Sequence, residues 1–172
     1  MKADKSPLME LGRIPTGIAA LDALELSRGL KAIIDTDDYE RASLYKWHAV
    51  PCAGMRGYKV ARVVKTKGGL RKAYLHHFIL GTTTMIDHIN HDCLDNRKSN
   101  LRICTASQNQ ANRRMAQNNR SGFKGVTRNK KKWQARIKQK SLGTFSTREE
   151  AALAYNVAAV ELFGEFACLN KL

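Results

Sequence analysis

The segment from Gly81 to Asn112 restricts the possible folds of this chain more than any other part of it. It is rich in Asp and Asn and contains one short apolar run, Leu101–Cys104. Directly after that run, Thr105 and Gln108 have the spacing of a capping box, in which each side chain accepts a hydrogen bond from the other residue's backbone N–H. The segment therefore predicts a loop, a short strand and a helix in direct succession.

Short alternating apolar runs predict antiparallel strands on both sides of this segment. Before it lie Ala32–Ile34, Leu44–Val50, Tyr58–Lys65 and Leu70–Leu80, the last two joined by a hairpin turn at Gly68 and Gly69. After it lie Gly125–Thr127, Trp133–Lys138 and Leu142–Phe145, followed by a helix from Arg148 to Phe163 with Ser146 or Thr147 as its N-cap. The fold class is therefore α+β.

The pattern divides the chain into four parts. Residues 1–30 hold Ile18, Leu21 and Leu24 among polar residues, which predicts a modest amphipathic helix of unknown role. Residues 31–112 form a first domain, and residues 113–121 form a basic linker without apolar periodicity. Residues 122–172 form a second, smaller domain.

The charge distribution indicates a polyanionic partner. The chain has 30 Lys and Arg against 15 Asp and Glu. Between Arg41 and Arg148 there are 24 Lys and Arg but only three carboxylates, a local net charge of +21, and these acids, Asp87, Asp92 and Asp95, fall within nine residues. A surface that is charged only for solubility usually mixes both signs, so this distribution favours nucleic-acid binding and a chemical role for the remaining acids.

Several other classes are excluded by composition. No apolar run approaches the ~20 residues of a membrane span, and the first residues contain Asp4 and Glu10 without the apolar stretch of a secretory signal. We therefore expect a cytoplasmic or nucleoid location and no membrane partner. The four Cys form no C-x-x-C pair, which argues against a zinc knuckle and a disulfide framework.

Asp87 and His88 have the chemistry that phosphodiester hydrolysis requires. A histidine can act as a base near neutral pH, and hard oxygen ligands such as those of Asp87 and Asn109 suit a divalent metal ion that neutralises phosphate charge. The helix that starts near Thr105 could bring Asn109 back to the same metal. The other loop residues, Asn90, Asp92, Asp95 and Asn96, are interpreted as loop formers that bond to nearby N–H groups.

The run Asp87-His88-Ile-Asn-x-Asp-x-Leu-Asp95-Asn96-Arg-x-x-Asn100-Leu-Arg102, with Leu75-His76 before it and Ser107-Gln-Asn109 after it, resembles HNH endonucleases of the phage and intron-homing type. The resemblance implies a ββα-metal finger. It implies Asp87 and Asn109 as metal ligands, His88 as general base, Asn100 as the residue that braces the loop and orients the base, and His76 as a strand histidine near the scissile phosphate. It also implies a divalent cation, with Mg²⁺ expected and Mn²⁺ as the alternative.

One position departs from that pattern. His91 stands where related sequences usually have a turn glycine. It would cost backbone strain if its φ is positive, or it could offer an additional ligand. His77 is interpreted as structural, and His48, beside Trp47, as a core residue.

The last fifty residues are similar to APETALA-type, ethylene-response-factor DNA-binding domains. The similarity runs from Gly122 to Asn170 and includes the strands around Trp133 and the Ala-rich helix with Tyr155. It implies a three-stranded antiparallel sheet that lies in the major groove, with one helix packed behind it. Arg136 and Ser141 stand where plant relatives have an acidic residue and a second aromatic, so no base specificity is transferred.

Together these features predict a homing-type HNH endonuclease that hydrolyses double-stranded DNA with one metal ion. The residues expected to bind DNA are Arg102, Arg113, Arg114, Lys124, Arg128, Trp133, Arg136 and Lys138. The competing interpretation is a non-catalytic, sequence-specific DNA-binding regulator that keeps the finger as a scaffold. The sequence leaves open the target site, the choice between nicking and double-strand cleavage, and the choice between monomer and homodimer.

Overall fold

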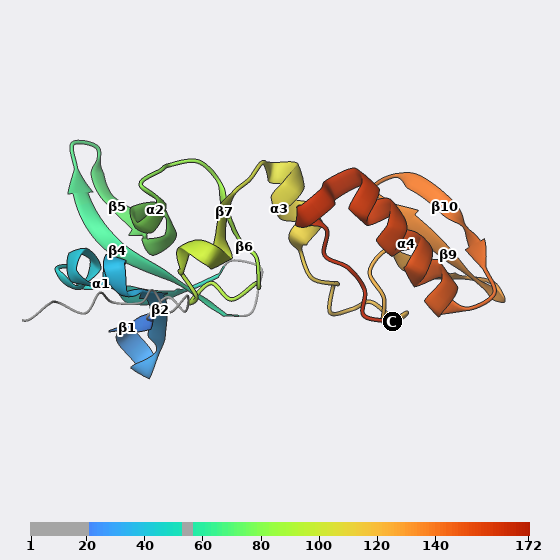
Figure 1. Ribbon diagram of the computed structural model, residues 1–172, viewed down its shortest axis with the longest axis horizontal. Helices are drawn as coiled ribbons and strands as arrows, with labels where there is room; N and C mark the ends of the chain where they lie inside the picture. The colour runs from blue at the N-terminus through green and yellow to red at the C-terminus, as the bar shows by residue number, and fades with distance from the viewer. Residues whose placement is uncertain (1–20, 53–56) are drawn as a thin grey trace, which may run out of the picture.

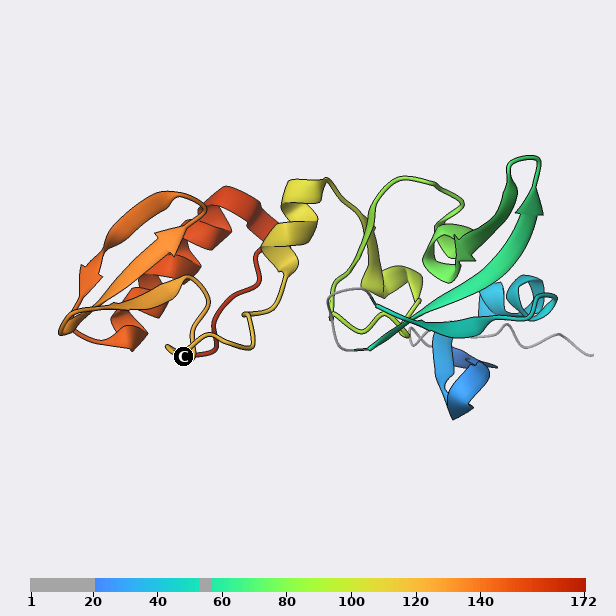
Figure 2. The same ribbon diagram turned by 180° about the vertical axis from the view of Figure 1, so that it is seen from behind.

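The computed structural model describes residues 21–52 and 57–172, which form two lobes joined through a short helix, α3 (Ala106–Asn112) (Figure 1). Within the described residues the strands form four small antiparallel sheets. The view from behind shows the same arrangement, with α3 beside the C-terminal lobe (Figure 2). The structure is therefore α+β, as the sequence predicts. No helix among the described residues is long and apolar enough to cross a membrane.

Two of the sheets and two helices build most of the N-terminal lobe. The elements are β1 (Leu21–Glu25), η1 (Ser27–Gly29), β2 (Lys31–Asp35), α1 (Thr36–Ser43), β3 (His48–Pro51), β4 (Tyr58–Thr66), β5 (Gly69–Tyr74) and α2 (Leu75–Leu80). Strand β1 pairs with β2, and β4 lies between β3 and β5. Leu24, Ile34, Trp47, Val60 and Leu75 are buried in one common core, so both sheets stabilise the same lobe.

The prediction of a helix before residue 30 is wrong where the structure describes it. Residues 1–20 lie outside the described residues, but Leu21–Glu25 is a strand. Leu24 and Leu26 are two positions apart and both buried, which is the period of a strand and not of a helix. Pairing with β2 satisfies the backbone of this segment, so it belongs to the core of the N-terminal lobe.

Two helices differ from the sequence-based prediction: one lies where no element was predicted, and the other lies where a strand was predicted. Thr36–Ser43 forms α1, with Asp37 and Asp38 in its first turn, where acids interact favourably with the helix dipole. The predicted strand Leu70–Leu80 ends at Tyr74, and Leu75–Leu80 forms α2. Leu75 and Ile79 are both buried at the i, i+4 spacing of a helix. His76 therefore lies on a helix and not on a strand.

The central segment folds as its spacing predicts. Strand β6 (Ile86–His88) pairs antiparallel with β7 (Leu101–Ile103), so that Asp87 lies opposite Arg102. Between the two strands lie a loop and a single turn, η2 (Lys98–Asn100). Helix α3 follows, and its Thr105–Gln108 capping box has both reciprocal hydrogen bonds. The result is two paired strands followed by a helix.

The C-terminal lobe consists of three strands covered by one long helix. The elements are β8 (Val126–Asn129), β9 (Lys132–Ile137), β10 (Lys140–Phe145), α4 (Arg148–Phe163) and η3 (Gly164–Phe166). Thr147 is the N-cap of α4 and forms a second capping box with Glu150. The small residues Ala151, Ala152 and Ala159 are fully buried, which allows α4 to pack close to the sheet.

The two lobes meet at α3. Ala111 of α3 and Cys104 pack with Phe166 of η3 in a small apolar cluster, next to Phe163. The backbone N–H of Cys168 donates to the Ala111 carbonyl at 3.4 Å. The helix of the central segment is thus part of both lobes.

Candidate active site

Asp87 and His88 are neighbours on β6, and both line one pocket of about 880 Å³. Both side chains are nearly inaccessible, with 6% and 7% of their surface exposed. The pocket is also lined by apolar residues such as Ile86 and Met115, and its other polar side chains come from four parts of the chain; they include Lys59, His76, His91, Asn109, Asn112, Arg113 and Arg114. The sequence-predicted residues Asp87, His88, Asn109 and His76 are therefore brought to one pocket.

Two side chains hold the Asp87 carboxylate. Arg102 donates from Nε at 3.0 Å and from Nη2 at 2.8 Å, both to Oδ2. Asn112 donates from Nδ2 to Oδ2 at 2.9 Å and to Oδ1 at 3.1 Å. A buried carboxylate needs such partners, because an unpaired charge is costly to bury. Oδ1 has one donor where Oδ2 has three, so Oδ1 keeps more of its capacity to bind a further group.

The His88 ring is oriented by Asn96, which is fully buried. His88 Nε2 lies 3.4 Å from Asn96 Oδ1, and Asn96 Nδ2 donates to the Cys93 carbonyl at 3.3 Å. Since the amide nitrogen faces a carbonyl, the oxygen faces the imidazole and can only accept. The proton of the neutral ring is therefore assigned to Nε2, which leaves the lone pair on Nδ1 available as a base.

His76 packs against His88 in an edge-to-face arrangement, with ring centroids 5.3 Å apart. On its other side it stacks on Tyr74 at 5.5 Å. Burial is the main cause that lowers the pKa of His76 to about 3, and the nearby His88, His77 and Lys59 act in the same direction. Burial also lowers the pKa of His88, partly offset by the bond to Asn96.

Asn100 braces the loop between the two strands. Its Oδ1 accepts from the Asn90 N–H at 2.9 Å, and its Nδ2 donates to the Asp95 carbonyl at 2.8 Å. Asp95 in turn accepts from Asn90 and forms an ion pair with Arg97 at 2.6 Å. These acidic and amide side chains bond to nearby groups of the loop itself. Asn100 fixes the loop, while the direct contact to the His88 ring comes from Asn96.

His91 has a positive φ of 65°, the conformation for which glycine is usual. Its Nε2 bonds to the carbonyl of Asn112 at the end of α3. This contact joins the loop after β6 to the helix. The His91 side chain is thus already bonded to the end of α3.

The donor set at the pocket fits a hard divalent cation. From the residues that the structure describes, Asp87 Oδ1 accepts only one hydrogen bond, that of Asn112. The Asn109 side chain donates from Nδ2 to Met85 Sδ at 3.5 Å, and its oxygen has no donor among the described residues. Mg²⁺ is commonly held by one or two protein oxygens together with water and phosphate. No group of three or more His, Cys, Asp or Glu side chains that could hold a metal occurs in the described part of the chain.

Two of the basic side chains that the sequence assigns to DNA binding instead form hydrogen bonds within the protein. Arg102 uses all three of its guanidinium nitrogens, since Nη1 donates to the Glu165 carbonyl at 2.7 Å. Lys124 donates from Nζ to the carbonyls of Ala111 at 2.5 Å and Arg113 at 2.7 Å. Arg113 and Arg114 are exposed at the pocket, although Arg114 also donates from Nη2 to the Asn90 carbonyl at 3.1 Å. These two remain suited to bind a phosphate backbone.

Only some of the DNA-binding residues that the sequence predicts in the C-terminal sheet lie on its open face. Register places Arg128 opposite Trp133, and its guanidinium lies 5.0 Å from that ring, on the same side as the buried Val126. Lys138 lies in the turn after β9, over the ring of Phe163. Arg136 points to the open face, which also carries Lys132 and Gln134 by the alternation of β9.

Sequence reasoning missed three contributors to the pocket. Asn112 is three residues after Asn109 and so lies on the same side of α3, a spacing that could have suggested it. Asn96 was interpreted as a loop former, although it also contacts the general-base candidate. Lys59 comes from β4, far away in the chain, and nothing in the local sequence links it to the pocket.

The fold and the site together define a unit of the ββα nuclease type. It is followed by a sheet-and-helix domain of a DNA-binding type. The family profile described as HNH endonuclease matches residues 83–111. The uncharacterized HNH endonuclease L560 of Acanthamoeba polyphaga mimivirus is 33% identical over 157 residues, covering 84% of this chain and 77% of that protein. The chain belongs to the HNH endonuclease family, which identifies it as a nuclease.

The C-terminal lobe is similar to plant transcription factors. The AP2-like ethylene-responsive transcription factor CRL5 of rice is 50% identical over 58 residues, and AIL5 of Arabidopsis thaliana is 48% identical over the same length. These matches cover 29% of this chain and only 9% and 10% of those proteins. They support an AP2-type domain in this part of the chain. No solved structure matches the chain.

Proposed function

We propose that this protein is a metal-dependent, homing-type endonuclease that hydrolyses phosphodiester bonds of double-stranded DNA. The observation that carries the proposal is that adjacent residues Asp87 and His88, from one short strand, line a single pocket with Asn109 and Asn112 of α3. Family membership supports the nuclease activity, and the exposed Arg113 and Arg114 at the pocket offer phosphate contacts.

In this proposal His88 accepts a proton from the attacking water at Nδ1, while Asn96 holds Nε2. Asp87 and Asn109 would hold the divalent cation, Mg²⁺ or Mn²⁺, through their side-chain oxygens. When bound, the cation supplies positive charge next to the scissile phosphate and the departing 3′ oxygen. His76 packs edge-to-face against His88 in the same pocket and would lie near the scissile phosphate. The products would carry 5′-phosphate and 3′-hydroxyl ends.

The C-terminal lobe would position the DNA. Its open β9 face offers Lys132, Gln134 and Arg136, and Arg is suited to guanine edges or phosphate. A single pocket of this kind would cut one strand at a time, so nicking is expected for a monomer.

The test uses supercoiled plasmid with Mg²⁺ or Mn²⁺. Wild-type protein is expected to produce open circles before linear DNA, and His88→Ala and Asp87→Ala are expected to lower the rate by about 100-fold or more, the usual range for loss of a general base. His48→Gln, outside the pocket, is the matched control and should cut like wild type. If wild-type protein retards DNA in a gel but never relaxes it, catalysis is rejected and a DNA-binding regulator remains.

A further inference from the structure

Both side chains that donate to Asp87 are themselves held by the C-terminal lobe. One is Arg102 of β7, and the other is Asn112 at the end of α3. Neither connection is needed for DNA binding by the C-terminal sheet, whose open face lies on β9. The contacts therefore call for a separate explanation.

Arg102 is fixed by two consecutive residues of η3. Its Nη1 donates to the Glu165 carbonyl at 2.7 Å, and its guanidinium lies 4.0 Å from the centre of the Phe166 ring. Only 12% of the Arg102 side chain is exposed. A guanidinium stacked on an aromatic face and bonded in its plane can take few other orientations. Glu165 and Phe166 thus determine how Arg102 presents its other two nitrogens to Asp87.

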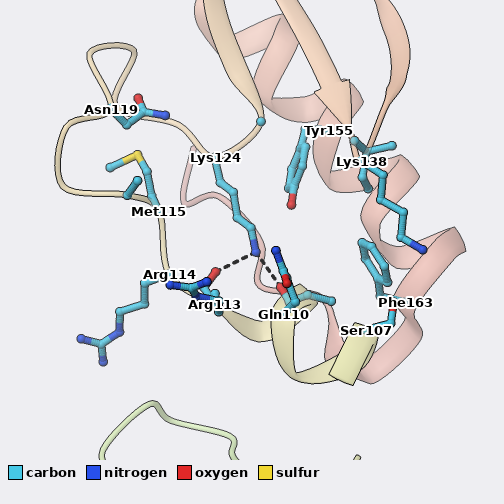
Figure 3. Close-up of a pocket in the computed structure, with 14 residues that line it drawn as sticks. Ser107, Gln110, Arg113, Arg114, Met115, Asn119, Lys124, Lys138, Tyr155 and Phe163 are labelled. Carbon is cyan, nitrogen blue, oxygen red and sulfur yellow. Dashed lines mark hydrogen bonds between the residues drawn. The ribbon is translucent and has the colours of Figure 1, made fainter. Parts of the chain in front are cut away.

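Asn112 is fixed through the end of α3. The last carbonyls of a helix have no partner within the helix, and Lys124 supplies one by donating to Ala111 and Arg113, the residues on either side of Asn112. Figure 3 shows the Lys124 side chain extending from the C-terminal lobe to this turn, with both bonds drawn. Helix α3 has only 7 residues, too few to be stable alone, so this support matters for the placement of Asn112.

We propose that Phe166, the Glu165 carbonyl and Lys124 are positioning elements of the active site, which act on Asp87 through Arg102 and Asn112. The C-terminal lobe then sets the rate of cleavage as well as the affinity for DNA. This inference rests on the proposed nuclease function, because it assigns a further role within that same site.

Phe166→Leu in the full-length protein tests the proposal, since Leu keeps apolar volume next to Cys104 and Ala111 but removes the aromatic face. We expect the single-turnover rate at saturating DNA to fall about tenfold or more, with the DNA dissociation constant changed less than about twofold. Phe166→Tyr retains the aromatic ring and should therefore cut at the wild-type rate. Val157→Ala, at an exposed position of α4, is the matched control and should change neither quantity.

A second readout does not depend on cleavage. The Nε–H resonance of Arg102, identified with Arg102→Lys, should be shifted by the Phe166 ring current in the wild type, and this shift should be lost in Phe166→Leu but kept in Phe166→Tyr. A Phe166→Leu protein that binds DNA more weakly but cuts at the wild-type rate when saturated would overturn the proposal, as would an unchanged Arg102 resonance. If wild-type protein never cuts while the resonance behaves as expected, the nuclease function fails and the contact is only structural.

Discussion

At the scale of single residues, the buried polar side chains Asp87, His88, Asn96 and Asn112 bond to one another or to neighbouring groups. The spacing in the sequence predicts Asp87, His88 and Asn100 as site residues, and the structure places the first two in the pocket and Asn100 in the adjoining loop. The roles of Arg102 and Asn96 could not be predicted, because they arise from contacts across β6 and β7 and across the loop, whereas Asn112 could have been suggested by its spacing from Asn109. Arg102 shows the difference most clearly: a lone basic residue suggests DNA, whereas its geometry assigns it to Asp87.

His76 should make the stability of the protein depend on pH. Its pKa is lowered to about 3 by burial, against an ordinary value of 6.5, so between these values the unfolded chain binds a proton that the folded protein does not. The contribution of the neutral ring is fully present above pH 6.5 and is lost as the pH falls. The free energy of unfolding should therefore decrease by up to about 1.4 kcal/mol per pH unit because of this residue.

The measurement is urea unfolding between pH 6.5 and 5, where His76 is neutral in the folded protein. His76→Phe keeps an aromatic ring next to Tyr74 and cannot titrate, so its stability should depend less steeply on pH than that of the wild type. Equal slopes for the two proteins would show that His76 takes up its proton without unfolding.

At the scale of elements, the sequence predicted best where local signals were complete. The capping box at Thr105 predicted the start of α3, and Ser146 or Thr147 as N-cap predicted the start of α4, where the structure selects Thr147. Leu75–Leu80 was predicted as strand because a short apolar run has no clear period, and only the burial of Leu75 and Ile79 against the N-terminal core selects a helix. Tertiary packing decided these shorter elements.

Gly125 should be the most sensitive glycine of the C-terminal lobe. It has a φ of 74°, and an added Cβ would lie 2.1 Å from the Tyr155 ring and 2.7 Å from the Arg136 carbonyl. Gly122 has a similar φ of 81° but open space around it. Gly125→Ala should therefore lower the free energy of unfolding by about 1–3 kcal/mol more than Gly122→Ala, the usual cost of overpacking. Denaturant unfolding of both variants checks this, and equal losses would contradict the close packing of α4 on the sheet.

At the scale of the whole molecule, two lobes of different character share α3. The N-terminal lobe places Asp87 and His88, and the C-terminal lobe offers an open cationic face on β9. The excess of Lys and Arg predicted a nucleic-acid partner from the sequence. The interface between the lobes could not be predicted, because Lys124 and Phe166 are ordinary residues of the second domain until their contacts with α3 and Arg102 are seen.

Arg136 should contribute one phosphate or base contact through the open face. Arg136→Ala is expected to weaken DNA binding and, if the contact is to phosphate, to reduce the slope of log K against log salt concentration by about 1. Fluorescence anisotropy over a salt series measures both. Lys31→Ala is the control, since Lys31 lies in the other lobe and pairs with Glu25 at 2.7 Å, and its slope should match the wild type. If Arg136→Ala keeps both the slope and the affinity of the wild type, the open face is not part of the DNA interface.

The shared helix has a consequence for engineering. A chimera in which residues 122–172 are exchanged for an unrelated DNA-reading domain would lose the groups that cap α3 and hold Arg102. Retargeting such an enzyme by domain exchange therefore requires a graft that retains Lys124 and the turn from Gly164 to Cys168 as part of the catalytic half.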